Sequence, residues 1–303
     1  MENNTPKVAI IIVNYNGYED TIECLNSLSK ISYPNFEVIV VDNHSSDKRI
    51  LEIKNIFPEV HLVSLKENKG FAGANNEGIR YCLANLKNVK YFLLLNNDTE
   101  VDKNFLFPLV DNMEKKTEIG ACSPLIFYFN SRDSLWFGGG AINWLYGKPY
   151  HLTKLQKGFN VDVENEFLTG CALLLSEKVI SNVGFMEESY FLYFEDVAYC
   201  LDIKAKGFKL AVVEESKIWH KVSSTTGYRS ALSNYYGTRN NLFFMKSYTN
   251  KTNFLYFFIL FTIKNLIKIT YYLLKGNGKI PKAILFAYLD FILGNLGKLN
   301  RKL

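Results

Sequence analysis

Two hydrophobic periodicities alternate along the first hundred residues, and this alternation constrains the fold more than any other feature of the chain. Short apolar runs, typical of buried strands, occupy 8–13, 36–41, 61–65 and 91–95. Between them, apolar residues spaced three or four apart are typical of helices within 22–28, 50–57 and 72–86. Successive strand–helix–strand steps predict an α/β fold with a mostly parallel, Rossmann-like sheet and right-handed crossovers.

Polar clusters follow three of these predicted strands. They are Asn14-Tyr15-Asn16, Asp42-Asn43 and Asn96-Asn97-Asp98. Open α/β sheets bind ligands beyond the carboxyl ends of their strands, so we expect the clusters to share one crevice. There Asp42 can accept from the imide N–H of a pyrimidine, Tyr15 can pack against the base, and Asp98 can hold a divalent cation. The plainer alternative is that Asp98 only caps the turn before Thr99.

A dinucleotide is the other ligand class that such a sheet accommodates. The loop after the first predicted strand, NYNGYED (14–20), contains one glycine. Close approach of a pyrophosphate in dinucleotide-binding folds uses the pattern G-x-G-x-x-G, and neither this pattern nor a Walker A sequence is present at that loop. The sequence therefore favours a nucleotide diphosphate over the cofactor of a nicotinamide oxidoreductase.

The basic charge of the chain is concentrated in an apolar tail. Residues 251–303 carry eight lysines and one arginine but a single acid, Asp290. The lysines at 264, 268 and 275 recur near one helical face, as in helices that contact anionic headgroups. We expect this tail to lie on a membrane surface rather than to bind nucleic acid; an ordinary buried helical hairpin is the alternative. A true span is disfavoured because Lys264 and Lys268 interrupt the first apolar stretch.

The remaining compositional features indicate a folded intracellular protein. Five widely spaced cysteines form neither a disulfide framework nor a zinc motif. The polar start MENNTPK does not have the pattern of a signal peptide. We therefore expect a cytoplasmic protein, peripheral to the inner face of the cell membrane through its tail.

Several motifs, taken together and in this order, resemble the family-two glycosyltransferases of the GT-A fold, especially their rhamnosyltransferase-like branch. The motifs are IIVNYNG (11–17), VVDNHSSD (40–47), NKGFAGANN (68–76), LLLNNDTEVD (93–102), FLTGCALLL (167–175), FLYFEDVAYC (191–200) and IWHKVSS (218–224). The resemblance extends from about residue 8 to about residue 241. It implies a GT-A catalytic domain over 1–250, followed by the helical tail at 251–303.

The resemblance assigns a nucleotide and metal site to the strand ends. Tyr15 and Asp42 correspond to nucleobase contacts, flanked by the neighbouring residues Asn14 and Asn16. Asn96-Asn97-Asp98 matches the D-x-D position, with Asn96 replacing the first acid, and Asp98 is then the expected ligand of Mg²⁺ or Mn²⁺. Asp102, further along, is expected to be structural.

Further residues follow from the same resemblance. Gly73 and Asn75 are expected near the ribose or diphosphate, although glycines there can also serve helix packing. His220 is expected to contact the metal or the diphosphate, although a lone histidine is commonly structural. Arg239 is expected near the donor phosphates, with an ordinary helix-surface arginine as the alternative.

The pair Glu195-Asp196 is expected to be catalytic. In the family the aspartate of this motif is taken to be the general base that accepts the proton of the acceptor hydroxyl. Relatives often carry a further acid two residues later, where this chain has Ala198. Trp136 with Gly138 to Gly140, and Thr169-Gly170-Cys171, are expected to shape the acceptor side.

These assignments predict an inverting, metal-dependent glycosyltransferase. The resemblance implies a nucleotide-sugar donor, dTDP-L-rhamnose first and a UDP-hexose as the alternative. The acceptor is expected to be a saccharide of bacterial cell-surface polysaccharide synthesis, with a polyprenyl-diphosphate-linked one as a candidate. A non-catalytic sugar-nucleotide-binding scaffold is the alternative from another functional class.

Overall fold

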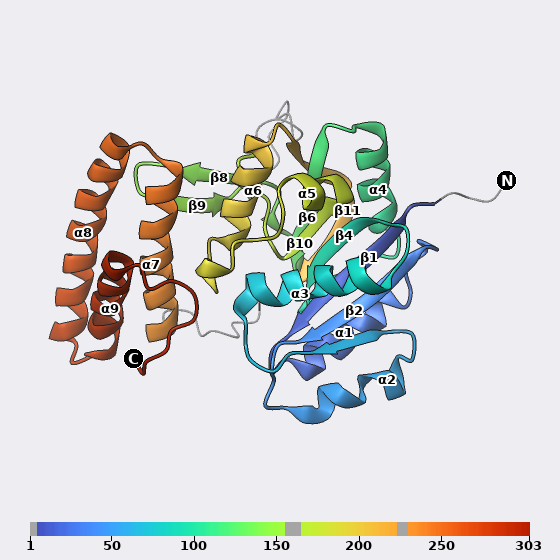
Figure 1. Ribbon diagram of the computed structural model, residues 1–303, viewed down its shortest axis with the longest axis horizontal. Helices are drawn as coiled ribbons and strands as arrows, with labels where there is room; N and C mark the ends of the chain where they lie inside the picture. The colour runs from blue at the N-terminus through green and yellow to red at the C-terminus, as the bar shows by residue number, and fades with distance from the viewer. Residues whose placement is uncertain (1–4, 155–164, 223–229) are drawn as a thin grey trace.

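The computed structural model describes residues 5–154, 165–222 and 230–303. Within these residues the main sheet has the strand order β3-β2-β1-β4-β10-β6-β11-β5, with β7 paired to β6 (Figure 1). The strands are β1 (Lys7–Asn14), β2 (Phe36–Asp42), β3 (His61–Ser64), β4 (Val89–Asn96), β5 (Thr99–Val101), β6 (Ile119–Tyr128), β7 (Ser131–Phe137), β10 (Ala172–Ser176) and β11 (Lys209–His220).

The strand directions confirm the α/β prediction with a mostly parallel sheet. Strands β3, β2, β1 and β4 run parallel, as the strand–helix alternation predicts, and β6 is parallel to β11. The later strand β10 joins the two halves because it is antiparallel to both β4 and β6. The carboxyl ends of β1, β2 and β4 therefore meet at one edge of the sheet.

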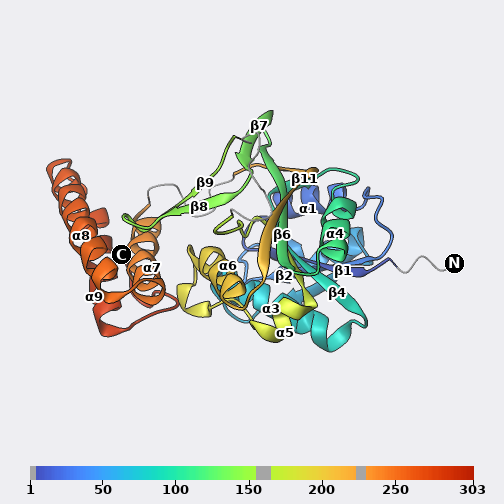
Figure 2. The same ribbon diagram turned by 90° about the horizontal axis from the view of Figure 1, so that it is seen from above.

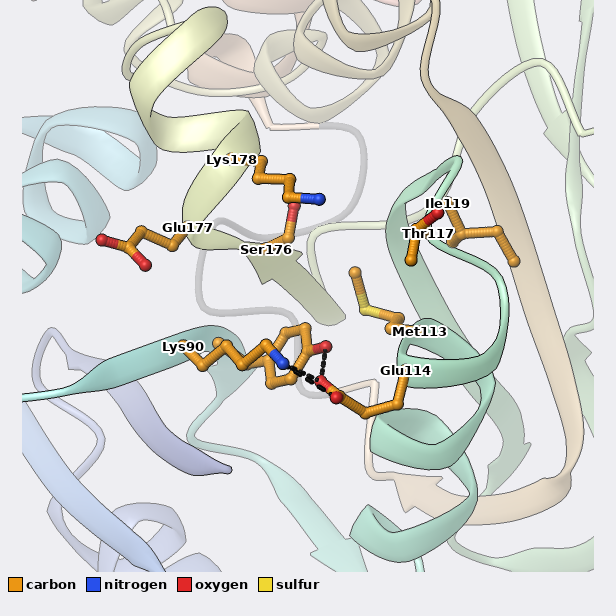
Figure 3. Close-up of a pocket in the computed structure, with 9 residues that line it drawn as sticks. Lys90, Met113, Glu114, Thr117, Ile119, Ser176, Glu177 and Lys178 are labelled. Atoms are coloured by element: carbon orange, nitrogen blue, oxygen red, sulfur yellow. Dashed lines mark hydrogen bonds and ion pairs between the residues drawn. The ribbon is translucent and has the colours of Figure 1, made fainter. Parts of the chain in front are cut away.

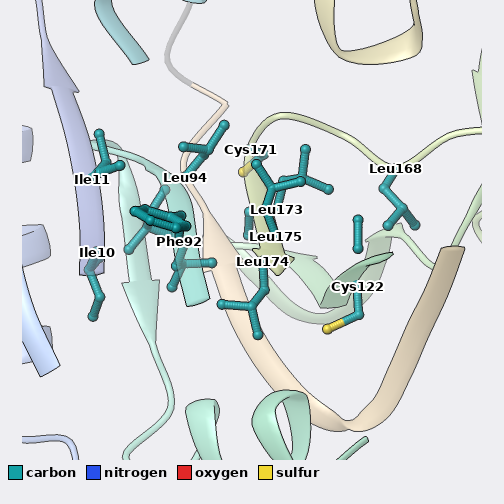
Figure 4. Close-up of a cluster of buried hydrophobic side chains, with 14 of the residues drawn as sticks. Ile10, Ile11, Phe92, Leu94, Cys122, Leu168, Cys171, Leu173, Leu174 and Leu175 are labelled. Carbon is teal, nitrogen blue, oxygen red and sulfur yellow. The ribbon is translucent and has the colours of Figure 1, made fainter. Parts of the chain in front are cut away.

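Helices cover both faces of the sheet. They are α1 (Tyr18–Leu28), α2 (Ile53–Ile56), α3 (Gly70–Asn85), α4 (Leu106–Lys115), α5 (Glu177–Asn182) and α6 (Glu195–Ala205), with 3₁₀ turns at Lys48–Glu52 and Glu188–Tyr190. Phe92 and Leu94 on β4 are fully buried and pair with Leu175 and Leu173 of β10 (Figure 4). Because both faces of β4 are covered, its sequence is a continuous apolar run rather than an alternating one. Gly78 lets α3 lie close to the sheet, since a Cβ there would stand 2.4 Å from Ile11 Cγ2.

Three long helices gather at one end of the sheet: α7 (Ala231–Tyr248), α8 (Lys251–Leu274) and α9 (Lys279–Leu293). Both views place α8 outermost, and α7 packs against both α8 and α9 (Figures 1 and 2). The hairpin of β8 (Gly140–Asn143) and β9 (Lys148–His151) reaches this group, where a Cβ on Gly147 would meet α7 and α8. The division of the chain at residue 250 stays a prediction, because α7 precedes it yet packs with the tail helices.

Candidate active site

A cleft of about 1180 Å³ opens at the carboxyl ends of β1 and β4. Its walls come from the strand ends, the start of α3, the end of β11, the segment 191–193 and the C-terminal residues. The predicted site residues that line it are Tyr15, Asn75, Asn96, Asn97, Asp98 and His220. Asn43 also lines the cleft, so each of the three strand-end clusters contributes a residue to it, as expected.

Asp98 and His220 form the most polar feature of the cleft. Asp98 lies in the turn between β4 and β5, and β5 pairs with β11 so that Thr99 is opposite His220. His220 Nε2 lies 3.0 Å from Asp98 Oδ1, and both side chains are nearly buried. The Nδ1 of His220 is buried and has no hydrogen-bond partner within the described residues. Asp98 thus occupies a turn, as the plainer alternative holds, and also faces the cleft.

This pair fits a hard divalent cation. Two neighbouring ligands of an octahedral cation, each about 2.1 Å from it, lie about 3 Å apart, which matches the separation of Asp98 Oδ1 and His220 Nε2. No group of three His, Cys, Asp or Glu side chains suited to a metal occurs in residues 5–154, 165–222 and 230–303. The chain itself therefore supplies two candidate ligands, and substrate oxygens and water would have to supply the rest.

Asp42 and Asn14 lie beneath the cleft rather than along it. Asn14 Nδ2 donates to Asp42 Oδ1 at 3.2 Å and to Ser45 Oγ at 3.0 Å, and both side chains are buried. Asn16, with a φ of 55°, accepts from the backbone N–H of Ser46 at 2.8 Å. These three predicted nucleotide contacts hold the loops after β1 and β2 together, and a direct contact of theirs with a base remains a prediction.

Two asparagines that line the cleft also shape it. Asn97 donates to the Gly17 carbonyl at 3.1 Å and so holds the start of α1. Asn43 donates to the Gly70 carbonyl at 3.1 Å and accepts from the Lys69 N–H at 2.8 Å. The sequence marked Asn43 only as part of a strand-end cluster, because its partners lie more than twenty residues away along the chain.

Gly73 does not line the cleft, which corrects its assignment to the nucleotide site. Asn75 does line it, and residues two apart on a helix are rotated by about 200° from each other. Gly73 therefore faces away, where a Cβ would stand 2.8 Å from Lys69 Cβ and 3.4 Å from Glu188 Oε2. It is a packing glycine, as the alternative expectation held.

Segment 191–194, which precedes the catalytic motif, has a strained backbone. Phe191, Tyr193 and Phe194 have φ values of 62°, 69° and 75°, a region that non-glycine residues rarely adopt. The Nδ2 of Asn240 lies 2.8, 2.7 and 3.0 Å from the carbonyls of Tyr190, Leu192 and Tyr193. Strain of this kind persists only when surrounding structure enforces it, and Asn240 is one source of that enforcement.

Arg239 also holds the strained 191–194 segment in place. This role corrects its assignment to the donor phosphates. Its side chain is buried and is not part of the cleft wall. The guanidinium donates to the carbonyls of Ser189, Tyr190 and Gly297, to Asn240 Oδ1 and to the Tyr235 hydroxyl. Because these partners occupy its N–H groups, Arg239 joins the 189–194 segment to the C-terminus and is a structural residue here.

Glu195 and Asp196 begin α6, directly after the strained segment. Asp196 accepts from the N–H groups of Gly170 at 2.9 Å and Val197 at 2.8 Å, whereas Glu195 is buried and its Oε2 has no partner within the described residues. Burial raises the pKa of Glu195 to about 8, and the neighbouring Asp196 adds to this. Burial also raises the pKa of Asp196, against the effect of its two N–H donors. When the pair carries one charge, these donors favour its location on Asp196. Neither side chain is part of the cleft wall.

Trp136 packs between His220 and His151, a histidine that the sequence did not predict to be near the site. Its ring lies 4.6 Å from that of His220 and 4.5 Å from that of His151, edge-on to both. Burial lowers the pKa of His151, while the charge of Asp196 opposes this effect. The antiparallel pairing of Gly140 with His151 places that histidine here, and no local motif announces it. The last residues of the motif at 218–224, 223 and 224, lie outside the described residues.

A second, smaller hollow at the amino end of β4 has different chemistry. It measures about 130 Å³, and its Glu114 is already paired with Lys90 and with the Tyr91 hydroxyl (Figure 3). Ligands of open α/β sheets bind at the opposite, carboxyl ends of the strands. The larger cleft at Asp98 and His220 is therefore the candidate site.

The fold and cleft place the protein in the GT-A class of α/β transferases. The crystal structure of GalNAc-T7 with UDP, GalNAc and Mn²⁺ has a similar fold, with a TM-score of 0.61 and 18% identity, over 80% of this chain and 51% of that one. The mannosyltransferase PcManGT from Pyrobaculum calidifontis, in complex with GDP-Man and Mn²⁺, matches 97% of this chain and 89% of its own, with a TM-score of 0.58 and 12% identity. The chain belongs to glycosyl transferase family 2, whose family model matches residues 9–184.

The relatives of similar sequence include a hexosyltransferase and a dTDP-rhamnosyl transferase. The low-salt glycan biosynthesis hexosyltransferase Agl10 of Haloferax volcanii is 26% identical over 81% of this chain and 77% of its own. The dTDP-rhamnosyl transferase RfbF of Shigella flexneri is 26% identical over 70% of this chain and 68% of its own. The protein is therefore a glycosyltransferase, and the resemblance noted from its motifs is confirmed.

Proposed function

We propose that this glycosyltransferase moves a sugar from a nucleotide-sugar donor to a saccharide acceptor, with inversion at the anomeric carbon. The observation that carries the proposal is the Asp98–His220 pair, 3.0 Å apart in the wall of the cleft, with Asp98 at the D-x-D position of the family. Neighbours of the same fold contain UDP or GDP-Man together with Mn²⁺, which supports a nucleotide-sugar donor.

Asp98 and His220 would hold Mg²⁺ or Mn²⁺. When bound, the cation supplies positive charge that stabilises the departing diphosphate. Asn96 supplies a neutral oxygen where the family often has an acid, so the chain contributes one carboxylate to this charge balance. Tyr15 and Asn75 line the same cleft and are suited to contact the nucleotide.

Asp196 is the proposed base. It accepts the proton of the acceptor hydroxyl as that oxygen forms a bond to the anomeric carbon; the bond from this carbon to the diphosphate breaks, and its electron pair leaves with the diphosphate. Its two N–H donors keep the carboxylate oriented, while the raised pKa of Glu195 favours a neutral neighbour. Because Asp196 is not among the residues that line the cleft, the bound acceptor must bring its hydroxyl to this carboxylate.

The donor is proposed to be dTDP-L-rhamnose, supported by the motifs and by the dTDP-rhamnosyl relative. A UDP-hexose is the second candidate, because another relative is a hexosyltransferase. We propose a role in bacterial cell-surface polysaccharide synthesis, at the cytoplasmic face of the membrane.

The tail is proposed to bind that membrane. Helix α8 is long and apolar enough to cross a bilayer by length and composition, the one such helix within the described residues. Its exposed apolar residues include Leu255, Ile259, Ile263, Leu266, Ile267 and Leu274. Lys264 is exposed beside them, but Lys268 donates to Asn234 of α7, which corrects its assignment to the headgroup-facing side. We favour a surface position, because α8 is also packed on one side through Phe257 and Phe261.

A thermal-shift panel tests the donor. dTDP-L-rhamnose, UDP-glucose and GDP-mannose are each added with and without MnCl₂, and we expect one donor to raise the melting temperature only when metal is present. Transfer to a saccharide acceptor by the stabilising donor should then be abolished by Asp196→Asn and retained by the control Asp102→Asn. Absence of stabilisation by every nucleotide sugar, or full activity of Asp196→Asn, would overturn the proposal.

A further inference from the structure

Part of the cleft wall is built by the C-terminal strap, which we define as residues 294–303. Strap residues Lys298, Leu299, Arg301 and Leu303 line the same cleft as Asp98 and His220, together with Lys279 at the start of α9. The tail is therefore part of the wall of the active-site cleft as well as a candidate membrane anchor.

Several hydrogen bonds fix the strap in this position. Gly297 donates to the Ser189 carbonyl at 2.7 Å and accepts from Arg239 Nη1 at 2.7 Å. The N–H of Leu299 donates to the Tyr236 hydroxyl at 2.9 Å. Leu299 and Leu303 also pack against the cluster around Tyr236 and segment 191–193. The strap side chains that line the cleft thus belong to a backbone segment that is hydrogen-bonded to the rest of the protein.

Charge is unevenly distributed along the cleft. Lys279, Lys298 and Arg301 lie at the strap end, whereas Asp98 is the only acidic side chain among the lining residues that the structure describes. Asp290 is buried and binds Arg301 Nη2, and the guanidinium stacks 5.0 Å over Phe286. This single hydrogen bond within the described residues orients Arg301 and leaves further N–H groups for a ligand. An adjoining hollow of about 660 Å³ adds Lys282.

The same end of the molecule also exposes apolar surface. On α9, which begins at Lys279, Leu285, Leu289, Ile292 and Leu293 are 58%, 43%, 71% and 61% exposed. A basic pocket beside such a face suits an amphiphile with an anionic head and an apolar chain. The head would lie in the cleft, against the basic side chains of the strap and Lys279.

We infer that Lys279, Lys298 and Arg301 form a binding subsite for the phosphate or diphosphate group of a lipid-linked acceptor, separate from the donor diphosphate site. This inference rests on the proposed function, because it assigns the acceptor class of the same cleft. The strap positions the acceptor's anionic group, and its saccharide extends toward Asp98 and Asp196.

Farnesyl diphosphate is the probe, and its binding to the full-length protein is measured by calorimetry in the presence of UDP and MnCl₂. We expect binding by the unaltered protein, at least tenfold weaker binding by Lys279→Gln/Lys298→Gln, and little binding of farnesol. The matched control Lys275→Gln/Lys302→Gln removes two tail lysines outside the cleft wall and should change the dissociation constant less than twofold. The test variant keeps the Arg301–Asp290 pair, so it should melt at the same temperature as the control.

Three outcomes would overturn the inference. The first is equal weakening in both double variants. The second is binding of farnesyl diphosphate without UDP that is lost when UDP is present. The third is that the Lys279→Gln/Lys298→Gln variant loses binding to phosphatidylglycerol vesicles but binds farnesyl diphosphate as the unaltered protein does. The last would mean that the lysines serve membrane headgroups instead. Failure of the proposed function would give a different result, namely that no nucleotide sugar stabilises the unaltered protein. If the proposed function holds, the Lys279→Gln/Lys298→Gln variant should be stabilised by the donor as much as the unaltered protein is.

Discussion

Replacing Glu195 by glutamine should stabilise the protein, and only above mildly acidic pH. Glu195 is buried, its Oε2 has no partner within the described residues, and Asp196 is its neighbour. The native pKa is raised from 4.5 to about 8, chiefly by burial. Between these two pH values the native state holds a proton that the unfolded state has released, so stability falls as pH rises. Glutamine cannot ionise and does not incur this loss.

The size of the effect follows from the same pKa. The interval from 4.5 to about 8, at about 1.4 kcal/mol for each pH unit, sets an upper limit of roughly 5 kcal/mol. We expect Glu195→Gln to exceed the unaltered protein in free energy of unfolding by about 2 to 5 kcal/mol at pH 8, and by under about 1 kcal/mol at pH 5. Since the other titrating groups are common to both proteins, the difference between the two curves reports the titration of the Glu195–Asp196 pair.

Urea unfolding followed by tryptophan fluorescence at pH 5, 6, 7 and 8 measures this difference. Glu59→Gln is the control, because Glu59 is exposed and its replacement should shift stability equally little at every pH. Parallel curves for Glu195→Gln and the unaltered protein, or lower stability of Glu195→Gln at pH 8, would refute the assignment of a buried, largely neutral glutamic acid.

Three further predictions concern the metal pair, the buried arginine and the tail. Asp98→Asn and His220→Gln should each remove the Mn²⁺-dependent part of donor stabilisation, and EDTA should do the same in the unaltered protein. The control Asp102→Asn should keep this stabilisation. Thermal shift measures each of these effects, and a response to Mn²⁺ retained by Asp98→Asn would contradict the proposed metal site. Arg239→Met removes three hydrogen bonds from the guanidinium to backbone carbonyls, two of which keep a second donor, at about 1 to 2 kcal/mol for each lost bond. We therefore expect a loss of roughly 3 to 6 kcal/mol and a lower kcat, against under about 1 kcal/mol for the exposed pair variant Arg132→Met. Equal melting temperatures of these two arginine variants would show that Arg239 does not brace the 189–194 segment. Ile267→Glu/Leu274→Glu on the outer face of α8 should reduce co-sedimentation with anionic liposomes several-fold without changing donor binding; unchanged co-sedimentation would remove the membrane role. These point variants are preferable to truncation at residue 250, which would also remove the strap that Arg239 holds.

The structure also separates two kinds of motif residue. Tyr15, Asn96 and Asp98 lie at or just after the ends of strands, so their position at the sheet edge depends on local pattern and could be predicted. Gly73 and Arg239 lie in helices, where a rotation of about 100° per residue decides whether a side chain faces the cleft. The motif alone does not fix that rotation, which is why both were assigned to the nucleotide site in error.

The sequence by itself determined the α/β fold, the family and the carboxylate at the end of β4, because these depend on hydrophobic period and on motifs of consecutive residues. The family motifs already implied that His220 lies near the metal of Asp98. Only the tertiary structure decided that the two side chains lie 3.0 Å apart, that His151 joins them through Trp136, and that the C-terminal strap walls the cleft. Each of these contacts joins segments far apart along the chain, brought together by β5–β11 pairing, by the β8–β9 hairpin and by the hydrogen bonds of Arg239. Such contacts depend on the packing of the whole chain, and no local pattern encodes them.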